Sequence, residues 1–478
     1  MAQPSTKSIP APKGTRDLYP DDLLRQRYIT EAWRRVSIRH GFDEIAGPTF
    51  EMLDLYKKKS GEGIVSELFS FRRTGGDDDY ALRPEFTPTL ARMYAAKANA
   101  LPSPCKWFTA GPYFRAEKPQ RGRLREFLQW NCDVMGGDTD NADFQSVFDA
   151  EIICVIVELF SDSGFSPNDV LVRLNSRSIL HSLLIHAGVE QSQVDAGVRL
   201  LDKWSKIDDV TRARECNAIG LDLNALNRAF QIADSMGSSS SRSGGITLGS
   251  LTSTANIDVT QLDRILRLVP KGWAIFDPGI ARGLAYYTGT VFELIADGER
   301  AVAGGGRYDN LIELFGGPPT PAVGFGMGDV VLGLLLQDKG LMPEGPELME
   351  ALSQKPASLR PEAFVIANEA GEAQVEPLLA KLRRGVESEA WNSRADKKPW
   401  DADRYCSNSG GVSPMHARRS YKSTKNIGKL LADARKQHAK FAVIIESDEA
   451  AKVENLDTRE DLGTFPLDGV GAAIAERL

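Results

Sequence analysis

A single segment, residues 108–133, narrows the range of folds open to this chain; it reads FTAGPYFRAEKPQRGRLREFLQWNCD. Aromatic residues flank both halves of the segment, and its middle holds Pro119 and Gly122, which favour a tight turn. We therefore predict two β-strands joined by a turn at Pro119–Gly122. Polar Gln129 and Asp133 fall at a period of two residues, which places them on the same face of the second strand.

Charge is concentrated around the predicted turn. The charged residues of this stretch are Arg115, Glu117, Arg121, Arg123 and Arg125. Planar guanidinium groups bind phosphate oxygens bidentately, whereas carboxylates and amides suit an amine or a cation. Two interpretations stay open at this point: a charged hairpin that faces solvent, or a phosphate-binding site. The continuation Phe127–Trp130 looks buried and would draw the polar residues inward, which favours the second interpretation.

Composition limits the classes of protein to consider. The chain has 478 residues, 42% hydrophobic and 26% charged, which fits a soluble protein of two to four domains. Its net charge of −7 argues against nucleic-acid binding by the whole surface, so any such contact must come from local basic patches. The five cysteines are scattered without a CxxC pair, which predicts reduced thiols.

The N-terminus and the apolar runs of the sequence match no targeting or membrane-spanning pattern. The sequence has no run of 18 apolar residues, so we predict no membrane span. Its first residues lack the apolar core of a secretory signal and read as a short flexible tail. The resulting expectation is a cytoplasmic protein.

In the first 330 residues helical and strand patterns do not alternate strictly, which favours a mixed α+β sheet over a doubly wound one. We predict helices over residues 21–40, 142–160, 179–185, 193–204 and 223–236, one near Pro88 within 82–96, and one from Val330. We predict strands over 170–174, 273–276, 290–295 and 300–303. Residues 236–254 are rich in Ser and Gly and read as a loop.

The last part of the chain alternates between strand and helix. A strand at 363–367, a helix up to Arg384, a helix at 427–437 and a strand at 440–445 predict an α/β domain. Residues 340–359 resemble a linker. Residues 390–414 are poor in apolar side chains, and we assign them no regular structure.

Four further segments combine polar side chains with glycine. They are residues 83–87, 282–289, 304–309 and 324–329. The glycine runs at 304–306 and 324–328 are expected to form tight turns or to let the backbone approach a ligand. Neither run gives a P-loop or a dinucleotide-binding pattern in a βαβ unit. Each segment is a weak indicator by itself.

Taken together and in this order, these segments resemble class II aminoacyl-tRNA synthetases, and within that class the histidyl-tRNA synthetase family. The resemblance begins at residues 13–17, continues through a dimer-interface motif that ends at Pro48, and includes the Arg115 and Glu117 region. Its most specific part is RGLAYYTG at 282–289. The resemblance implies a mainly antiparallel catalytic sheet with a helical insertion and a C-terminal α/β anticodon-binding domain. The implied boundaries are 1–165 and 256–340 for the catalytic domain, 166–255 for the helical insertion, 341–360 for a linker and 361–478 for the anticodon-binding domain.

The resemblance also implies residue roles. Arg115 would hold the α-phosphate of ATP, and Arg282 would lie between it and the carboxylate of histidine, so both are the expected catalytic residues. The expected histidine-binding residues are Glu85, Thr87, Gln129, Asp133, Arg282, Tyr286, Tyr287 and Tyr308. The expected ATP-binding residues are Arg115, Glu117, Arg123 and Phe127. The expected tRNA-binding residues are Gln120, Arg121, Arg125, Arg418, Arg419, Lys422 and Lys425.

The implied activity is that of a histidine–tRNA ligase. ATP and Mg²⁺ would be required, the partners would be tRNA(His) and a second copy of the chain, and no metal site formed by the protein alone is expected. Three residues depart from the family pattern: Phe86 replaces Gly, Ala285 replaces Asp and Val331 replaces Arg. Asp329 is a weak candidate for a metal ligand. These departures leave two alternatives, a histidine-sensing regulatory subunit and a sensor of uncharged tRNA.

Overall fold

The computed structural model describes residues 9–137, 142–186, 188–202, 207–222, 224, 258–277, 279–280, 287–296, 301–354, 358–398, 401–422, 424 and 426–478. It divides into two compact units, one formed by residues 1–18 and 29–341 and the other by residues 19–28 and 342–478. The predicted helix at 223–236 and the Ser-rich loop at 236–254 lie outside the described residues, apart from Asn224.

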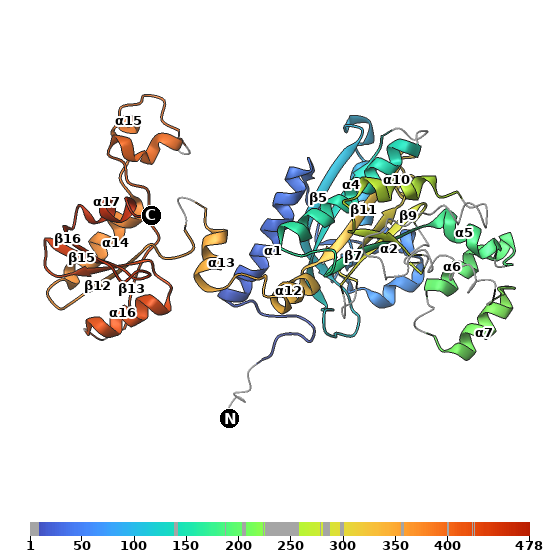
Figure 1. The fold of residues 1–478 in the computed structure, drawn as a ribbon, viewed down its shortest axis with the longest axis horizontal. Helices are drawn as coiled ribbons and strands as arrows, with labels where there is room; N and C mark the ends of the chain where they lie inside the picture. The colour runs from blue at the N-terminus through green and yellow to red at the C-terminus, as the bar shows by residue number, and fades with distance from the viewer. Residues whose placement is uncertain are drawn as a thin grey trace. The chain divides into compact units, whose positions relative to one another are not determined.

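An eight-stranded sheet forms the centre of the first unit (Figure 1). In spatial order its strands are β1 (Asp43–Glu44), β5 (Cys105–Phe114), β6 (Glu126–Met135), β11 (Ala322–Gly328), β10 (Ala303–Arg307), β9 (Thr290–Ala296), β7 (Val170–Ser176) and β8 (Ala274–Phe276). Only the outer pairs β1–β5 and β7–β8 are parallel. The five inner pairs are antiparallel. The predicted α+β class with a mainly antiparallel sheet is confirmed.

Strands β5 and β6 form the predicted hairpin. Their register runs from Cys105 opposite Met135 to Phe114 opposite Glu126. At the tip, Gln120 and Arg123 exchange backbone hydrogen bonds of 3.0 and 2.9 Å. Gly122 has a φ of 73°, a conformation that favours glycine and closes the turn. The hairpin and the position of its turn are therefore as predicted.

Apolar packing covers one face of β6. Trp130 stacks on Trp33 of α1 (Pro20–Arg39) with ring centroids 5.9 Å apart. Phe325 of β11 meets Trp130 edge-on at 4.8 Å. The indole nitrogen of Trp130 donates a 2.9 Å hydrogen bond to the hydroxyl of Ser37, so this buried polar atom is satisfied. Because side chains alternate along a strand, the neighbours of Trp130 point to the opposite face of the sheet.

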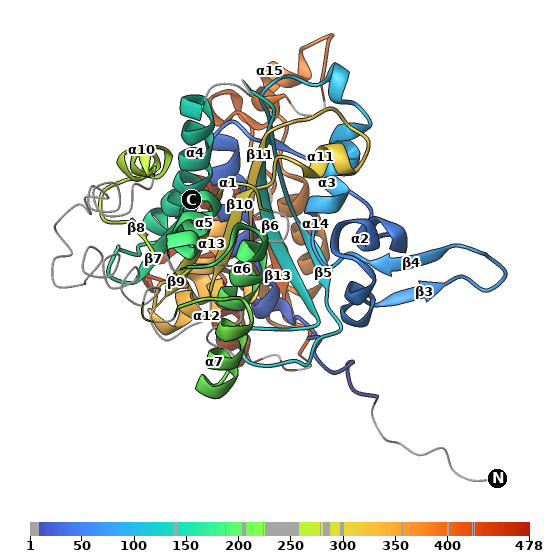
Figure 2. The same cartoon turned by 90° about the vertical axis from the view of Figure 1, so that its right-hand side faces the viewer.

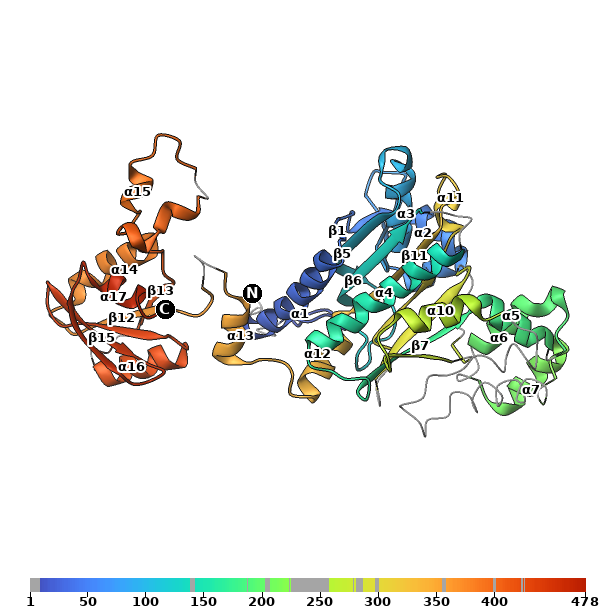
Figure 3. The ribbon, with the colours of Figure 1, turned by 45° about the horizontal axis from the view of Figure 1, so that its top comes forward.

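Further helices pack around this sheet. They are α2 (Leu53–Ser60), α3 (Thr87–Ala95), α4 (Ala142–Asp162), α10 (Thr260–Leu268), α11 (Leu311–Leu314) and α12 (Asp329–Asp338). Figure 3 shows α4 and α10 side by side along the sheet. Short 3₁₀ helices lie at Glu62–Glu67, Ala98–Ala100 and Gln191–Gln193. The helices predicted at residues 21–40, 142–160 and from Val330 are present, and the one predicted near Pro88 begins at Thr87.

A small sheet and a helical segment complete the first unit. The order β2 (Phe50–Met52), β4 (Asp79–Leu82), β3 (Ser70–Arg72) forms a three-stranded sheet, and its β3–β4 hairpin projects from the rest of the unit (Figure 2). The helices α5 (Arg177–His186), α6 (Val194–Asp202) and α7 (Asp209–Ala218) form the helical segment. Because β7 pairs with β9, residues 170–176 belong to the central sheet, and the helices start at Arg177 rather than at residue 166.

Both glycine runs differ from the predicted turns. Gly304–Gly306 lies within β10 and Gly324–Gly328 lies within β11, and these two strands pair with each other. Glycine has low strand propensity, which is why the runs read as turns. The strand predicted at 300–303 is shifted accordingly, since β10 begins at Ala303.

The second unit contains a five-stranded sheet in the order β13 (Ala417–Arg419), β12 (Ala363–Ala367), β14 (Phe441–Ile445), β15 (Ala450–Asn455), β16 (Asp461–Pro466). The first three strands are parallel. Its helices are α13 (Gly345–Leu352), α14 (Val375–Arg384), α16 (Ile427–Lys436) and α17 (Val470–Ala475), with a 3₁₀ helix at Glu372–Gln374. The predicted α/β alternation is present, but the predicted linker at 340–359 contains α13.

The excursion, defined here as residues 386–412, departs from the sheet between α14 and β13. Its two ends exchange backbone hydrogen bonds of 2.7 and 2.8 Å between Val386 and Val412. It contains α15 (Glu389–Asn392) and 3₁₀ helices at Ala402–Tyr405 and Ser407–Ser409. The expectation of no regular structure over 390–414 was therefore wrong. The guanidinium of Arg404 lies over the rings of Trp391 and Tyr405, which are contacts that apolar periodicity does not reveal.

Among the helices that the structure describes, none combines the length and hydropathy needed to cross a lipid bilayer.

Candidate active site

Polar side chains line one face of β6 inside the first unit. Gln129, Asn131 and Asp133 are buried at consecutive positions of this face. A Cβ added to Gly324 of the adjacent β11 would overlap the carboxylate of Asp133, and one added to Gly326 would lie 2.6 Å from Nε2 of Gln129. Because Gly324 and Gly326 of β11 have no side chains on this face, there is room for the polar groups of β6.

The two carboxylate oxygens of Asp133 differ in their partners within the described part of the chain. The hydroxyl of Tyr308 donates a 2.5 Å hydrogen bond to its Oδ1. Its Oδ2 is buried and accepts no hydrogen bond from any residue that the structure describes. Burial raises the pKa of Asp133 from 3.8 to about 7, and the hydrogen bond from Tyr308 opposes that rise. A buried acceptor without a partner indicates a site that a donor on a ligand can complete.

Tyr308 is held in place by a buried ion pair at the end of β10. Arg307, directly before it, is almost fully buried and pairs with Asp149 of α4 at 2.5 Å. Asp149 also accepts a 2.7 Å hydrogen bond from the hydroxyl of Thr290. Burial raises the pKa of Asp149, and the nearby guanidinium of Arg307 acts in the opposite direction.

Three other predicted histidine-binding residues, Tyr287, Gln129 and Thr87, belong to the same unit. Tyr287 packs against the apolar cluster that contains Tyr308, and a Cβ on Gly306 would lie 2.8 Å from its ring. Gln129 donates a 2.9 Å hydrogen bond to Asn131. Thr87, the first residue of α3, is buried.

The predicted α-phosphate ligand Arg115 follows β5. Its Nε donates a 3.2 Å hydrogen bond to the carbonyl of Pro84, and its guanidinium lies 5.1 Å from the ring centroid of Phe127 on β6. Glu85 follows Pro84 directly in the chain. Arg115, Phe127 and the Pro84–Glu85 segment therefore come from three elements and meet at one place.

The turn of the β5–β6 hairpin carries the remaining predicted residues of this region. Arg123 forms an ion pair with Glu117. Arg121 pairs with Asp338 of α12 at 3.1 Å, and both side chains are largely exposed. Arg125 donates to the backbone carbonyl of Glu117 at 3.1 Å, so its guanidinium helps to fix the hairpin. Gln120 takes part in the backbone pairing of the tip.

Of the three residues that depart from the family pattern, two lie in the described part of the structure. Phe86 is fully buried in the core. Val331 is buried in α12, and its Cγ2 lies 3.1 Å from the point where a Cβ on Gly122 would be, so it supports the tip of the hairpin. The predicted residues Arg282, Tyr286 and Lys425 lie outside the described residues, and so does Ala285.

Asp329, the weak metal candidate, has protein partners. It pairs with Arg16 and accepts a 2.9 Å hydrogen bond from the backbone N–H of Leu128. Its carboxylate therefore ties the N-terminal segment to β6. In the described part of the chain no group of three or more His, Cys, Asp or Glu side chains is arranged to hold a metal ion.

Two residues that the sequence reading missed adjoin the site. Lys59 of α2 binds both carboxylate oxygens of Glu85 at 2.7 Å. Arg83 is buried, donates to the carbonyl of Pro112 at 2.8 Å and lies 4.7 Å from the ring centroid of Tyr113. Lys59 is the last of three consecutive lysines, and such a run predicts a solvent-exposed helix surface. The sequence therefore did not indicate that Lys59 is buried against Glu85.

In the second unit, the basic residues predicted to bind tRNA are partly neutralised. Arg419 pairs with Glu372 and Glu376 at 2.7 and 2.8 Å, and Lys422 pairs with Asp433 at 2.9 Å. Arg418 is exposed and donates to His416 at 2.8 Å. Residues 416–440 contain eight Lys or Arg and one Asp, but the local excess of positive charge is smaller than this count, because Glu372, Glu376 and Asp433 pair with two of the cations.

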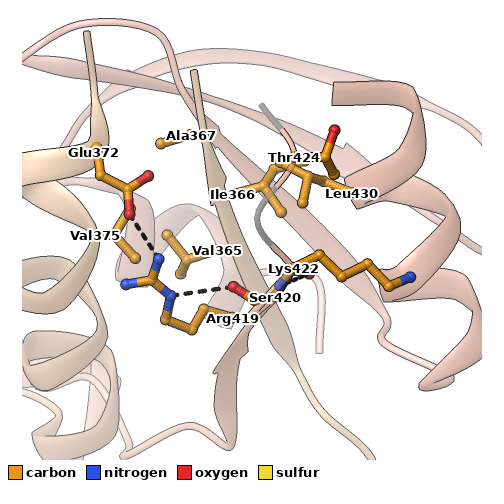
Figure 4. Close-up of a pocket in the computed structure, with 10 residues that line it drawn as sticks. All are labelled: Val365, Ile366, Ala367, Glu372, Val375, Arg419, Ser420, Lys422, Thr424 and Leu430. Carbon is orange, nitrogen blue, oxygen red and sulfur yellow. Dashed lines mark hydrogen bonds and ion pairs between the residues drawn. The ribbon is translucent and has the colours of Figure 1, made fainter. Parts of the chain in front are cut away.

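A cavity of about 230 Å³ opens at the carboxyl ends of β12 and β13 (Figure 4). Its lining includes Ala367, Arg419, Ser420, Lys422 and Thr424. The phenol of Tyr421, between two of these residues in sequence, is 86% exposed, and the guanidinium of Arg419 lies 5.7 Å from its ring centroid. An exposed aromatic ring among cationic side chains is a feature of surfaces that bind single-stranded nucleic acid.

The mainly antiparallel sheet of the first unit is of the type found in class II aminoacyl-tRNA synthetases, and comparison with known proteins identifies the family. The family model described as histidyl-tRNA synthetase matches residues 14–328. The histidine–tRNA ligase of Opitutus terrae is 39% identical over 335 residues, 69% of this chain and 75% of the relative, and that of Pyrococcus furiosus is 35% identical over 343 residues, 70% and 76%.

A solved structure agrees in fold. The histidyl-tRNA synthetase from Nostoc sp. PCC 7120 superposes with a TM-score of 0.71 at 22% identity and covers 99% of this chain and 100% of that one. The chain belongs to the histidyl-tRNA synthetase family.

The raised pKa of Asp133 leads us to predict how the free energy of unfolding depends on pH. In the folded state the carboxyl group of Asp133 keeps its proton up to about pH 7, whereas in the unfolded state it releases the proton near pH 4. Its contribution to the free energy of unfolding is therefore fully present below pH 4 and is lost as the pH rises through 7. Asp133→Asn does not titrate, so its stability relative to the native chain should rise between pH 4 and 8, by about 4 kcal/mol at most.

Thermal or urea denaturation of both proteins at several pH values measures this difference. A difference that stays constant from pH 4 to 8 would contradict a raised pKa of Asp133.

Proposed function

We propose that this chain activates histidine with ATP to give histidyl-adenylate, and then transfers the histidyl group to tRNA(His) in the cytoplasm. As a member of its family the chain is an aminoacyl-tRNA ligase, and the relatives it resembles are named histidine–tRNA ligases. The observation that most supports a histidine substrate is the buried Oδ2 of Asp133, which has no hydrogen-bond partner among the described residues. The N–H group of an imidazole would satisfy this acceptor.

The side-chain pocket would recognise histidine by paired polar groups. Asp133 would accept from one ring nitrogen, while Tyr308 fixes the orientation of its carboxylate. Tyr287 would contact the other ring nitrogen. An amino acid that lacks these nitrogens would leave buried polar atoms unpaired, and this kind of mismatch discriminates strongly between substrates.

Arg115 would stabilise the charge that develops during activation. The carboxylate of histidine attacks the α-phosphorus of ATP, a bond to the phosphorus forms, and pyrophosphate leaves. Negative charge then builds on the phosphoryl oxygens, and preorganised cations lower the barrier. Arg115 is preorganised, because Pro84 and Phe127 both hold its guanidinium. Arg282 would supply the second cation.

The nucleotide would lie along the hairpin. Phe127 would stack on the adenine ring, Glu117 would accept from the adenine amino group, and Arg123 would turn from Glu117 to the terminal phosphates. Mg²⁺ would arrive with ATP and neutralise part of the phosphate charge, since this ion commonly binds substrate phosphates, water and one or two carboxylates. Among the described residues, no group of three or more His, Cys, Asp or Glu side chains could hold the ion by itself, so the phosphates of ATP would provide its main ligands.

Histidine-dependent exchange of pyrophosphate into ATP tests the activation step. Arg115→Ala should reduce the exchange rate about 10²- to 10³-fold, because one preorganised cation is removed from the transition state. Arg267→Ala, which removes a largely exposed arginine of α10, should leave the rate unchanged. A well-folded native chain without exchange would exclude the ligase and leave the regulatory-subunit or tRNA-sensor alternatives.

The tRNA would bind on both units. Gln120, Arg121 and Arg125 belong to the hairpin next to the proposed nucleotide site. In the second unit, Arg418, Arg419, Lys422 and Lys425 would contact the backbone of tRNA, and the ring of Tyr421 would stack on an unpaired base. The exposure of Tyr421 and the cavity beside Arg419 support this assignment.

Tyr421→Ala should raise the KM for tRNA in aminoacylation about 5- to 150-fold, because stacking contributes about 1–3 kcal/mol per base. The rate of pyrophosphate exchange should not change, since that reaction takes place in the other unit. Tyr19→Ala removes another exposed tyrosine and serves as the matched control. An unchanged KM for tRNA in Tyr421→Ala would refute the role of this ring.

We further propose a homodimer. The exposed aromatic surface, defined as Phe50, Phe71 and Tyr80 of the three-stranded sheet, has ring centroids 5.7–5.9 Å apart. Phe50 and Phe71 are 51% and 44% exposed. Contiguous exposed apolar side chains mark interaction surfaces, and β3 is an edge strand of its sheet within the described residues, a position that can pair with another chain.

Phe71→Glu introduces a charge into this surface and should shift the sedimenting species from a dimer toward the 52.3 kDa chain. Val210→Glu on α7 changes another exposed apolar residue and should leave the dimer intact. A native chain that sediments as a monomer at micromolar concentration would rule out the dimer.

A further inference from the structure

Lys59 and Glu85 form an ion pair beside the proposed histidine site. The Nζ atom of Lys59 lies 2.7 Å from both Oε1 and Oε2 of Glu85. The side chain of Lys59 is only 6% exposed and that of Glu85 is 25% exposed. This contact joins the end of α2 to the segment between β4 and α3.

The inward position of Lys59 distinguishes it from its two lysine neighbours. Lys57 pairs at 3.2 Å with Glu62, whose side chain is 80% exposed, and Lys58 lies over the ring of Phe315 at 5.9 Å. A buried ammonium group is stable only when a carboxylate and hydrogen bonds compensate its desolvation. Its place in the last turn of α2 also favours a cation, because the carboxyl end of a helix carries negative partial charge.

Glu85 lies where a ligand amine could reach it. The carbonyl of the preceding Pro84 accepts from Arg115, and Thr87 two residues later begins α3. An ionised carboxylate has about four lone-pair sites, and the ammonium of Lys59 uses one side of each oxygen. The remaining sites can accept hydrogen bonds from a second ammonium group while the first stays bound.

We propose that Lys59 is a positioning residue, which holds the carboxylate of Glu85 in the orientation that receives the α-ammonium group of the substrate histidine. This inference rests on the proposed function, in which Glu85 binds that group. Lys59 stays paired when the substrate binds, because releasing a buried ammonium from its carboxylate would leave its charge uncompensated. A carboxylate fixed in advance also loses less conformational freedom on binding than a mobile one.

Two competitive inhibitors separate this role from a structural one. l-Histidinol carries the amine of histidine without its carboxylate, and 3-(imidazol-4-yl)propionate carries the carboxylate without the amine. Lys59→Met should weaken inhibition by l-histidinol about 10- to 100-fold, the range for losing a charge-assisted contact. It should change inhibition by imidazolylpropionate by less than about twofold, because Glu85 does not contact that compound.

The kinetic constants should follow the same pattern. Lys59→Met should raise the KM for histidine and leave the KM for ATP near its native value. Lys57→Met, on the same helix, provides the matched control and should match the native chain with both inhibitors. Equal weakening of both inhibitors would indicate a general disturbance of the site and overturn the proposal. Unchanged or tighter binding of l-histidinol would overturn it too.

Glu85→Gln distinguishes this proposal from the proposed function on which it rests. If Glu85→Gln weakens inhibition by l-histidinol but Lys59→Met does not, Glu85 binds the amine without help from Lys59, and only the positioning role is refuted. If neither variant weakens inhibition by l-histidinol, the assignment of Glu85 itself is refuted. Should Lys59→Met not fold, as judged by its thermal denaturation, Lys59→Gln is measured in the same way, since it keeps an N–H donor and removes the charge.

Discussion

The buried polar side chains on one face of β6 fit into the sheet because the adjacent strand, β11, has glycines opposite them. Asp133 and Gln129 need space that any Cβ on Gly324 or Gly326 would occupy. Without that space their polar atoms would have to leave the interior or clash with β11. The glycines of β11 thus allow a strand in the middle of a sheet to carry a polar pocket. The position of Tyr308, and through it the proposed imidazole site, follows from this arrangement.

The opposite face of β6 provides the stability that such a pocket requires. Oδ2 of Asp133 is buried without a hydrogen-bond partner among the described residues, and such an atom lowers the free energy of unfolding, so other contacts of the strand must compensate for it. Trp130 does so by stacking on Trp33 and meeting Phe325 edge-on. The strict alternation of side chains lets one ten-residue strand serve both purposes, with its apolar face toward α1 and its polar face toward the pocket.

The hairpin could be predicted from neighbouring residues alone. Pro119 and Gly122 indicate its turn, and the two-residue alternation of side chains along a strand indicates which residues share a face. The glycine runs were misread as turns because the need for glycine comes from groups outside these runs, such as Asp133 beside Gly324 and Tyr287 beside Gly306, and not from their own sequence. Lys59 was missed for a similar reason, because its partner Glu85 is 26 residues away and comes close only in the folded chain. Likewise, the charge of Arg419 could not be judged without the carboxylates of α14.

The pairing of Val386 with Val412 brings the two ends of the excursion next to each other. Because the chain enters and leaves the excursion at nearly the same point, the number of residues between Val386 and Val412 has little effect on the geometry of the sheet. Evolution could therefore lengthen, shorten or replace this part without altering how β12 and β13 align. The family can thus vary a peripheral appendage of the second unit while its sheet stays the same.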